Sequence, residues 1–415
     1  MVAMTRAARA ALLAPAALAA LATTACLSTP AYEPPPSALT FGDDTGGGGG
    51  ASVSAEGFVL HFAGGAGFHF PDVHAVDGTN IIGRDTTAPC YAEDGVGLVL
   101  FPTPRISALT GALVTTSQIT ATMRGPAVTQ VRIDWSSQFV CSNNHPGGSS
   151  LYTVFLDGRI VRHDSLDDQT TAQTSSLACA CDANHNQGFQ IASYWTFNPA
   201  AFSTLTVPGS TNGPIPLPKD PLMPFRSPNF YVGCLDAGSY QVGFAWSTST
   251  DVAGTPKIVA TPTQVVFSRE RTGGFVSTFD PLLWGTNDAV FVEHTGCKKA
   301  LERASEHAQP SSLSVGGKPI AVSLVNGIYA GDPGQGGVPG KPGVKLPPGR
   351  VELTGPVGSS FAVWLQFTSG VDAVRAQLAG KTGAWYVLQR IDATSWIAWF
   401  RDPLMAEETI AIETL

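Results

Sequence analysis

The stretch LYTVFLDGRIVRH, residues 151–163, decides the fold class. Two runs rich in β-branched and aromatic residues flank the dipeptide Asp157-Gly158. Asp-Gly supplies the positive φ angles that the tight turn of a β-hairpin requires. The sequence therefore predicts a hairpin here, with Arg162 and His163 near the end of its second strand.

Strand-like patterns continue on both sides of this hairpin. Val131, Ile133 and Trp135 alternate with Arg132 and Asp134, which is the period of a strand with one buried and one exposed face. Further strands are expected at 58–62, 97–101, 118–123, 188–197, 240–246, 257–267 and 290–294. Many short strands separated by turn residues predict an all-β fold, an antiparallel β-sandwich or layered double sheet.

The composition agrees with a turn-rich sheet protein. The 415 residues include 45 Gly and 31 Pro, and only 13% are charged, about half the ~25% usual in globular chains. The net charge of −8 comes with no basic stripe that could neutralise phosphates, so no nucleic-acid partner is expected. Few Lys, Glu and Arg also argue against a fold made mainly of exposed helices.

Helical signals are few. The run CKKALERASEHA at 297–308 predicts one short helix with an alanine face, and 371–379 suggests a second. Helices do not alternate with strands as a parallel α/β sheet requires, so Rossmann and TIM-barrel folds are disfavoured.

The N-terminus has the pattern of an export signal. Arg6 and Arg9 precede an apolar run over 10–22, which is shorter than a spanning helix needs, and small residues lead to Cys26.

Residues 1–26 resemble the bacterial lipoprotein signal class, whose lipobox ends in cysteine. Thr24 and Ala25 fit its last two places, while Thr23 stands where leucine is preferred. The resemblance implies cleavage after residue 25 and a lipid on Cys26, which anchors the chain in a membrane. Ordinary secretion is the alternative. Leu27, rather than aspartate, implies the outer membrane, so the protein is expected to face the periplasm or the cell surface.

Six cysteines remain, and an even number in an exported protein predicts disulfides. Cys179 and Cys181 are too close in sequence to pair with each other without strain. The six candidates are Cys90, Cys141, Cys179, Cys181, Cys234 and Cys297.

One local pattern repeats: Cys141 is followed by His145 as Cys181 is followed by His185. Two Cys-x3-His halves could hold a metal, but a Cys141–Cys181 disulfide between two loops is favoured in an oxidising compartment. No metal site and no cofactor are therefore expected. The histidines at 61, 69 and 74 are interpreted as structural, with His61 on the same strand face as Val59.

The chain divides by composition. We predict a signal peptide at 1–25, a flexible Gly/Pro-rich tether at 26–50, a main β domain at 51–330, a Gly/Pro-rich connector at 331–349 and a smaller β region at 350–415. This last region either forms a small sandwich of its own, which is preferred, or completes sheets begun upstream.

Catalytic motifs are missing from the sequence: it has no nucleotide-binding loop, no Gly-x-Ser-x-Gly and no His-Glu-x-x-His. A polysaccharide-active enzyme would need paired carboxylates. The candidates, which turns or solvated loops also explain, are Asp134, Asp157, Asp164, Asp167, Asp168 and Glu293.

The favoured function is therefore a binding or structural module without enzymatic activity, with glycans as the ligand class, because Trp and Tyr suit stacking on sugars. Trp396 and Trp399 fall on opposite faces of one strand, so one of them is a candidate for a ligand face or a domain contact. The alternatives are a polysaccharide hydrolase or lyase, and an accessory subunit of an envelope assembly. The candidate ligand-binding residues are Trp135, His145, His163, His185 and Trp396.

Overall fold

The computed structural model confirms the all-β prediction. It describes residues 40–44, 50–62, 71–75, 77–82, 96–102, 112–139, 147–166, 189–209, 213–218, 225–228, 231–246, 255–273, 288–331, 337–338, 341–378, 385–401 and 408–415. These residues form mainly antiparallel sheets, together with the helix α2 (Cys297–Ala308) and the 3-10 turn η1 (Pro199–Ala201). Among them, two strands, β22 (Ile328–Gly331) and β24 (Lys341–Leu346), pair in parallel with β26 (Phe361–Phe367). No helix among them is long and apolar enough to cross a membrane.

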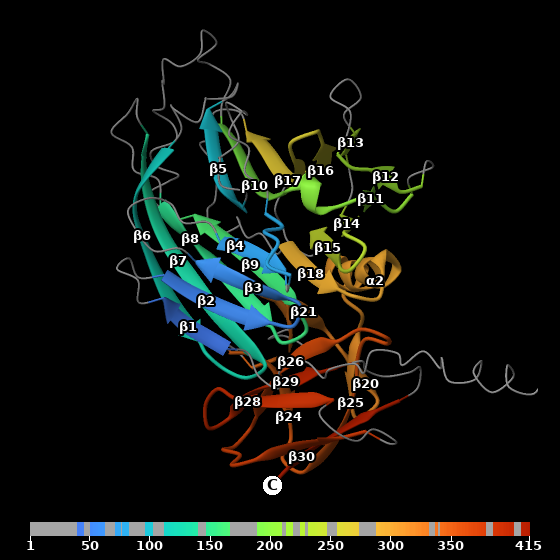
Figure 1. Cartoon of the computed structure of the whole chain (residues 1–415). Coiled ribbons are helices and arrows are strands. Elements are labelled where there is room, and N and C mark those ends of the chain that lie inside the picture. Colours follow the sequence, from blue (N-terminus) through green and yellow to red (C-terminus); the bar gives the residue numbers. More distant parts are fainter. Residues whose placement is uncertain are drawn as a thin grey trace, which may run out of the picture. The chain divides into compact units, whose positions relative to one another are not determined.

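A nine-stranded sheet is the centre of the main β region (Figure 1). The predicted hairpin forms its β8–β9 pair, with Val154 opposite Ile160. Gly158 has a φ of +77°, and a Cβ there would lie 2.6 Å from the carbonyl oxygen of Glu56, so this turn requires glycine. In spatial order the strands are β12 (Ile215–Pro216), β11 (Thr204–Thr206), β14 (Val232–Asp236), β15 (Gln241–Trp246), β18 (Asp288–Glu293), β9 (Arg159–Leu166), β8 (Gly147–Phe155), β7 (Val128–Phe139) and β6 (Ala112–Met123).

Two smaller sheets cover one face of this large sheet. One has the order β1 (Thr40–Asp44), β2 (Gly50–Ala55), β3 (Phe58–Phe62) and β4 (Pro71–Ala75). The other has the order β13 (Phe225–Pro228), β16 (Thr255–Ala260), β17 (Val265–Gly273), β10 (Phe189–Phe197) and β5 (Val96–Pro102). The expected single strand at 257–267 is thus two strands, because residues 261–264 form a turn closed by the hydrogen bond from Thr261 N to Gln264 O.

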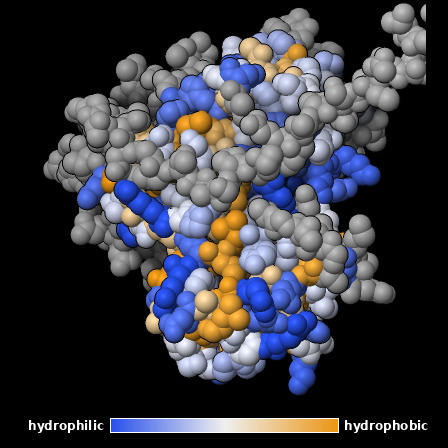
Figure 2. Space-filling model, turned by 60° about the horizontal axis from the view of Figure 1, so that its bottom comes forward, coloured by the Kyte–Doolittle hydropathy of each residue, from blue (hydrophilic) through white to orange (hydrophobic). Residues whose placement is uncertain are grey.

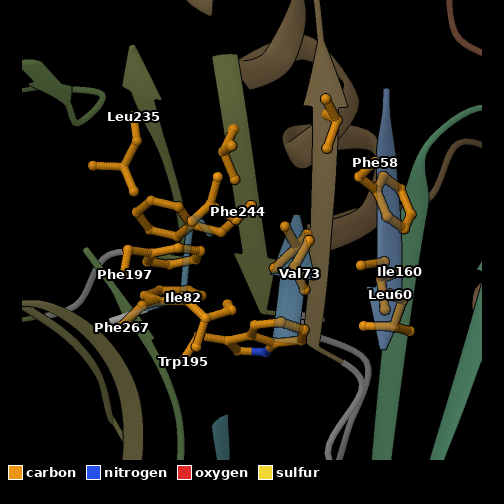
Figure 3. Packing of buried hydrophobic residues seen from close by; sticks show 14 of the residues in the cluster. Phe58, Leu60, Val73, Ile82, Ile160, Trp195, Phe197, Leu235, Phe244 and Phe267 are labelled. Carbon is orange, nitrogen blue, oxygen red and sulfur yellow. The ribbon is translucent and has the colours of Figure 1, made fainter. Parts of the chain in front are cut away.

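The core lies between these layers. Figure 3 shows Leu60 and Val73 beside Ile160 in one part of it, and Phe197, Phe244 and Phe267 in the other. The rings of Phe244 and Phe267 are 4.4 Å apart between centroids. One continuous apolar cluster therefore contains residues of all three sheets. The large sheet is one layer and the two smaller sheets are the other, as in a layered double sheet.

The other face of the nine-stranded sheet is covered by α2 and by the C-terminal strands. Ala300 and Ala304 of α2 are completely buried, as the alanine face of the sequence predicted. Gly243 of β15 lies so close to the helix that a Cβ there would be 2.9 Å from the carbonyl oxygen of Ala300. From the C-terminal strands, Ala362, Ile397 and Trp399 enter the same apolar cluster as Val128, Phe155 and Ala289 of the large sheet.

The C-terminal region has two sheets and its own core. One sheet has the order β20 (Lys318–Ile320), β19 (Leu313–Val315), β25 (Arg350–Thr354), β30 (Ile410–Thr414) and β27 (Val374–Gln377). The other contains β21 (Val322–Val325), β22 (Ile328–Gly331), β23 (Gly337–Val338), β24 (Lys341–Leu346), β26 (Phe361–Phe367), β28 (Tyr386–Arg390) and β29 (Ser395–Phe400). A band of apolar residues crosses the surface between polar ones in the space-filling view (Figure 2).

Strands from before residue 350 belong to both of these sheets. β19 pairs with β25, and β22 and β24 pair with β26. The strands of 350–415 thus share their sheets with strands from 313–346. Part of the expected connector, Lys341–Leu346, is a strand because Val344 and Leu346 are buried in the C-terminal core.

The second predicted helix is wrong. Val374–Gln377 is strand β27, which pairs with β30. Ala376 of this strand and Leu378, directly after it, are buried while Arg375 and Gln377 are not, so strand pairing and burial override the weak helical preference of this segment.

Candidate functional site

A completely buried ion pair lies within the nine-stranded sheet and is joined to the facing sheet by a tryptophan. Arg162 of β9 and Asp288 of β18 are paired in register, and Arg162 Nη2 lies 3.2 Å from Asp288 Oδ2. Trp195, on β10 of the facing sheet, donates its indole N–H to the same carboxylate oxygen. The Arg162 guanidinium also lies 5.3 Å from the centre of a Trp195 ring.

All three of these side chains are inaccessible to solvent. A carboxylate in this setting is neutralised by its guanidinium partner and cannot reach a substrate, so the group joins layers rather than performing chemistry. Sequence reasoning singled out Arg162 but not Asp288. The one feature that could have indicated Asp288 is its position, a charged residue at the start of the otherwise apolar run DAVFV.

A second buried network fixes α2 to the predicted hairpin. Arg303 of α2 donates hydrogen bonds to the backbone carbonyls of Asp157 and Val292, at 3.0 and 3.1 Å. It also pairs with the carboxylates of Asp157 and Glu293, at 3.2 and 3.3 Å. Asp157 and Glu293, both carboxylate candidates in the sequence, therefore hold the helix against the sheet.

This network changes the pKa of the Glu293 carboxyl group. Burial alone would raise the pKa of its carboxyl group, but the guanidinium of Arg303 opposes this effect. Hydrogen bonds from the His294 N–H and the Thr295 hydroxyl add to that opposition, and the pKa of Glu293 is held below its usual value. The group is thus a charged anchor rather than a proton donor near neutral pH.

One surface with accessible polar groups lies on β6–β9. We call it the polar strip. Its two cross-strand rows are Thr120–Arg132–Leu151–His163 and Gln118–Asp134–Ser149.

Gln118, Thr120 and Arg132 are exposed, and the side chains of Arg132 and Asp134 keep 49% and 42% of their surface. Arg132 and Asp134 form an ion pair of 2.6 Å along the same strand. Further along the same strands this face of the sheet becomes buried. There Gln130 donates a hydrogen bond to the hydroxyl of Thr153 at 3.2 Å. The polar strip can therefore present amide, hydroxyl and guanidinium groups on a rigid sheet.

Comparisons with known proteins give no family. No family model matches the sequence, and no curated protein does. The chain is distantly similar to solved structures of carbohydrate-active enzymes. They include a GH36 alpha-galactosidase from Geobacillus stearothermophilus (9% identity, 61% of this chain and 42% of that one, TM-score 0.37), an alpha-N-acetylgalactosaminidase from Bifidobacterium bifidum (10%, 66% and 38%, 0.37) and a heparan sulfate lyase from Pedobacter heparinus (9%, 69% and 40%, 0.33). The chain spans about two fifths of the length of these structures.

The candidate ligand residues lie in different places. His163 is half-buried on β9 in the polar strip, and Trp135 is on β7, opposite Gly148. Trp396 is 8% exposed and belongs to the C-terminal core. The lipid-anchor candidate Cys26, and His145, His185, Cys90, Cys141, Cys179 and Cys181, lie outside the described residues.

Trp396 and Trp399 are on opposite faces of β29, as their odd spacing predicted. Trp396 packs in the C-terminal core with Arg390 5.8 Å from its ring, whereas Trp399 is in the cluster that joins this region to the large sheet. The second face of β29 is therefore a contact between regions.

A disulfide in the described part of the chain joins two of the six candidate cysteines. Cys234 of β14 is bonded to Cys297, the first residue of α2, and their Cα atoms are 5.7 Å apart. This bond fixes the start of the helix whose middle is held by Arg303.

The histidine group near the N-terminal sheet is only partly covered by the structure, since His69 lies outside it. His61 and Val59 share a partly exposed face of β3, as predicted. His61 and His74 lie side by side, with 5.2 Å between ring centroids. Within the described ranges no three His, Cys, Asp or Glu residues form a group that could hold a metal ion.

Proposed function

We propose that this protein is an exported, lipid-anchored module of the bacterial envelope that binds glycans on the polar strip of β6–β9. The observation that carries the proposal is the strip itself, two adjacent rows of exposed or half-buried residues that are polar except for Leu151. Amide, hydroxyl and guanidinium groups match the hydroxyl groups of a sugar as donors and acceptors.

Binding is favoured over cleavage because of how the described carboxylates are used. In the strip, Asp134 is the one described carboxylate, and it is already paired with Arg132. Glycoside hydrolysis uses two carboxyl groups about 5–9.5 Å apart. Asp157, Glu293 and Asp288 are paired with arginines inside the fold, which supports a structural use for them.

We expect hydrogen bonds rather than stacking on tryptophan to supply the affinity, because most of the described tryptophan side chains are buried. Among the tryptophan side chains that the structure describes, Trp364 is half-buried and the other five are buried. The buried five are Trp195, Trp246, Trp385, Trp396 and Trp399.

Retention on a panel of immobilised polysaccharides tests the binding proposal, using the full chain in detergent. We expect retention without new reducing or unsaturated ends. Gln118→Ala and Arg132→Ala should each weaken it about tenfold, because losing one hydrogen bond to a charged or polar group costs about 1.5 kcal/mol. Arg350→Ala is the matched control, since Arg350 is also exposed and paired with a carboxylate, that of Glu413 at 2.7 Å.

The outcomes separate the alternatives. New reducing or unsaturated ends on the polysaccharide would show cleavage, and the protein would then be a polysaccharide hydrolase or lyase rather than a binding module. No retention of any polysaccharide would overturn glycan binding and favour an envelope assembly, for which the edge strand β6 offers a pairing surface.

The lipid anchor has its own test. We expect labelling of the protein by a lipid precursor in cells and loss of the label in Cys26→Ala. An unlabelled wild-type protein would leave ordinary secretion as the explanation of the export signal.

A further inference from the structure

Two histidines share the outer face of the N-terminal sheet. His61 of β3 is opposite Asp72 of β4, and His74 is opposite Val59, so the two histidines are diagonal neighbours across the strand pair. Their side chains are half-buried, while Leu60 and Val73 beside them in the chain are completely buried. The core thus fixes the backbone under both rings, and solvent still reaches the rings.

The tautomer of His74 is set by the turn that follows β4. His74 Nδ1 lies 3.2 Å from the carbonyl oxygen of Gly78. A carbonyl only accepts hydrogen bonds, so Nδ1 carries the proton and Nε2 of the neutral ring keeps its lone pair. Gly78 is held in place by the hydrogen bond from its N–H to the carbonyl of Ala75 at 2.8 Å, and its φ of +82° suits glycine.

This is the arrangement found behind metal-binding histidines, in which the second ring nitrogen donates to a backbone carbonyl and orients the ring. The spacing agrees with that use. Two imidazoles bound to one tetrahedral ion at Zn–N distances of ~2.0–2.1 Å have ring centroids about 5 Å apart. The centroids of His61 and His74 are 5.2 Å apart, with the rings at 87° to each other.

We propose that His61 and His74 bind a divalent transition-metal cation through their imidazole nitrogens. Imidazole suits zinc, nickel and copper, and Cu²⁺ should bind most tightly of these. Within the described residues the ion has these two imidazole ligands, and no three His, Cys, Asp or Glu side chains form a group there. Asp72, across from His61 in the register, adds a negative charge that favours a cation.

Cu²⁺ and Zn²⁺ titrations of the full chain test this site. Calorimetry gives the affinity, and electron paramagnetic resonance of the Cu²⁺ complex counts the bound nitrogens. We expect two nitrogens in the wild-type protein, and a loss of affinity of at least about tenfold in His61→Gln and in His74→Gln, since even partners behind a ligand contribute 10–100-fold. Circular dichroism should show that both variants fold, because their side chains are partly exposed.

His145→Gln with His185→Gln is the control, because these residues belong to the other metal hypothesis that the sequence raised. We expect that double variant to bind as the wild-type protein does. Absence of binding by the wild-type protein, undiminished binding by His61→Gln and His74→Gln, or loss confined to the control would each overturn the proposal.

Discussion

Arg162 and Asp288 face each other on neighbouring strands and form an ion pair that is completely buried. Removing one partner of such a pair leaves an uncompensated charge in the core, which costs about 3–5 kcal/mol. We therefore expect Asp288→Ala to lower the free energy of unfolding by that amount in urea titrations.

Two comparisons make this prediction specific. Arg162→Met combined with Asp288→Leu removes both charges and should be more stable than Asp288→Ala alone. Asp134→Ala breaks the exposed pair with Arg132 and should cost at most about 1 kcal/mol. Equal losses for Asp288→Ala and Asp134→Ala would contradict the structural role of the buried pair.

Gln389 of β28 connects the C-terminal sheet to the large sheet. Its side-chain oxygen accepts hydrogen bonds from the backbone N–H groups of Ala127 and Val128, at 3.3 and 3.0 Å. Gln389→Ala leaves these buried donors without that partner, so we expect a loss of about 1–3 kcal/mol in the free energy of unfolding.

Gly125 offers a second route to the same contact. A Cβ at position 125 would collide with the side chain of Gln389, so Gly125→Ala should also destabilise the protein. Because Gln389→Ala removes the atoms that collide, the double variant should be more stable than the sum of the single losses implies. Additive losses would show that the two residues do not share this contact.

Local signals made part of this fold predictable. The β8–β9 hairpin follows from Asp157-Gly158 between two β-rich runs, and α2 has the bounds expected from its composition, Cys297–Ala308. Alternation also places Val131 and Ile133 in the core and Arg132 on the surface. Each of these depends on residues close together in the chain.

Long-range partners decided the rest. Arg162 and Asp288 are 126 residues apart, so sequence order gives no sign that they meet. Lys341–Leu346 has the Gly/Pro content of a connector. It is nevertheless a strand, because it pairs with β26 and buries apolar side chains in the C-terminal core. His163 and Asp134, singled out separately in the sequence, come to one surface only through the register of β7, β8 and β9.

The Cys234–Cys297 disulfide should contribute stability by constraining the unfolded chain. It closes a loop across 63 positions of sequence, and such a bond stabilises a protein by about 2–4 kcal/mol. We expect Cys234→Ala combined with Cys297→Ala to lose that amount in urea unfolding while keeping the far-ultraviolet circular dichroism of the folded protein. Arg303 still holds α2 in this variant. A change in the folded spectrum would show that the helix depends on the disulfide for its formation.

Glu293 predicts how stability depends on pH. Burial acts to raise the pKa of its carboxyl group, but the Arg303 guanidinium and the hydrogen bonds from His294 and Thr295 bring it below the ordinary value of 4.5. The unfolded chain therefore takes up the proton first as the pH falls, and the carboxylate stabilises the folded protein fully only above about pH 4.5. This contribution is lost as the pH falls through the lower pKa of the folded state.

Unfolding of the wild-type protein and of Glu293→Gln at a series of pH values checks this sign. At pH 7 the wild-type protein should be the more stable of the two, because glutamine cannot neutralise the guanidinium of Arg303. Below pH 4.5 the difference in stability between the two proteins should shrink, since the protonated carboxyl of Glu293 is uncharged, as the glutamine side chain is. A difference that stays constant from pH 7 to pH 3, or one that grows on acidification, would show that the ion pair with Arg303 does not stabilise the position of α2 on the sheet.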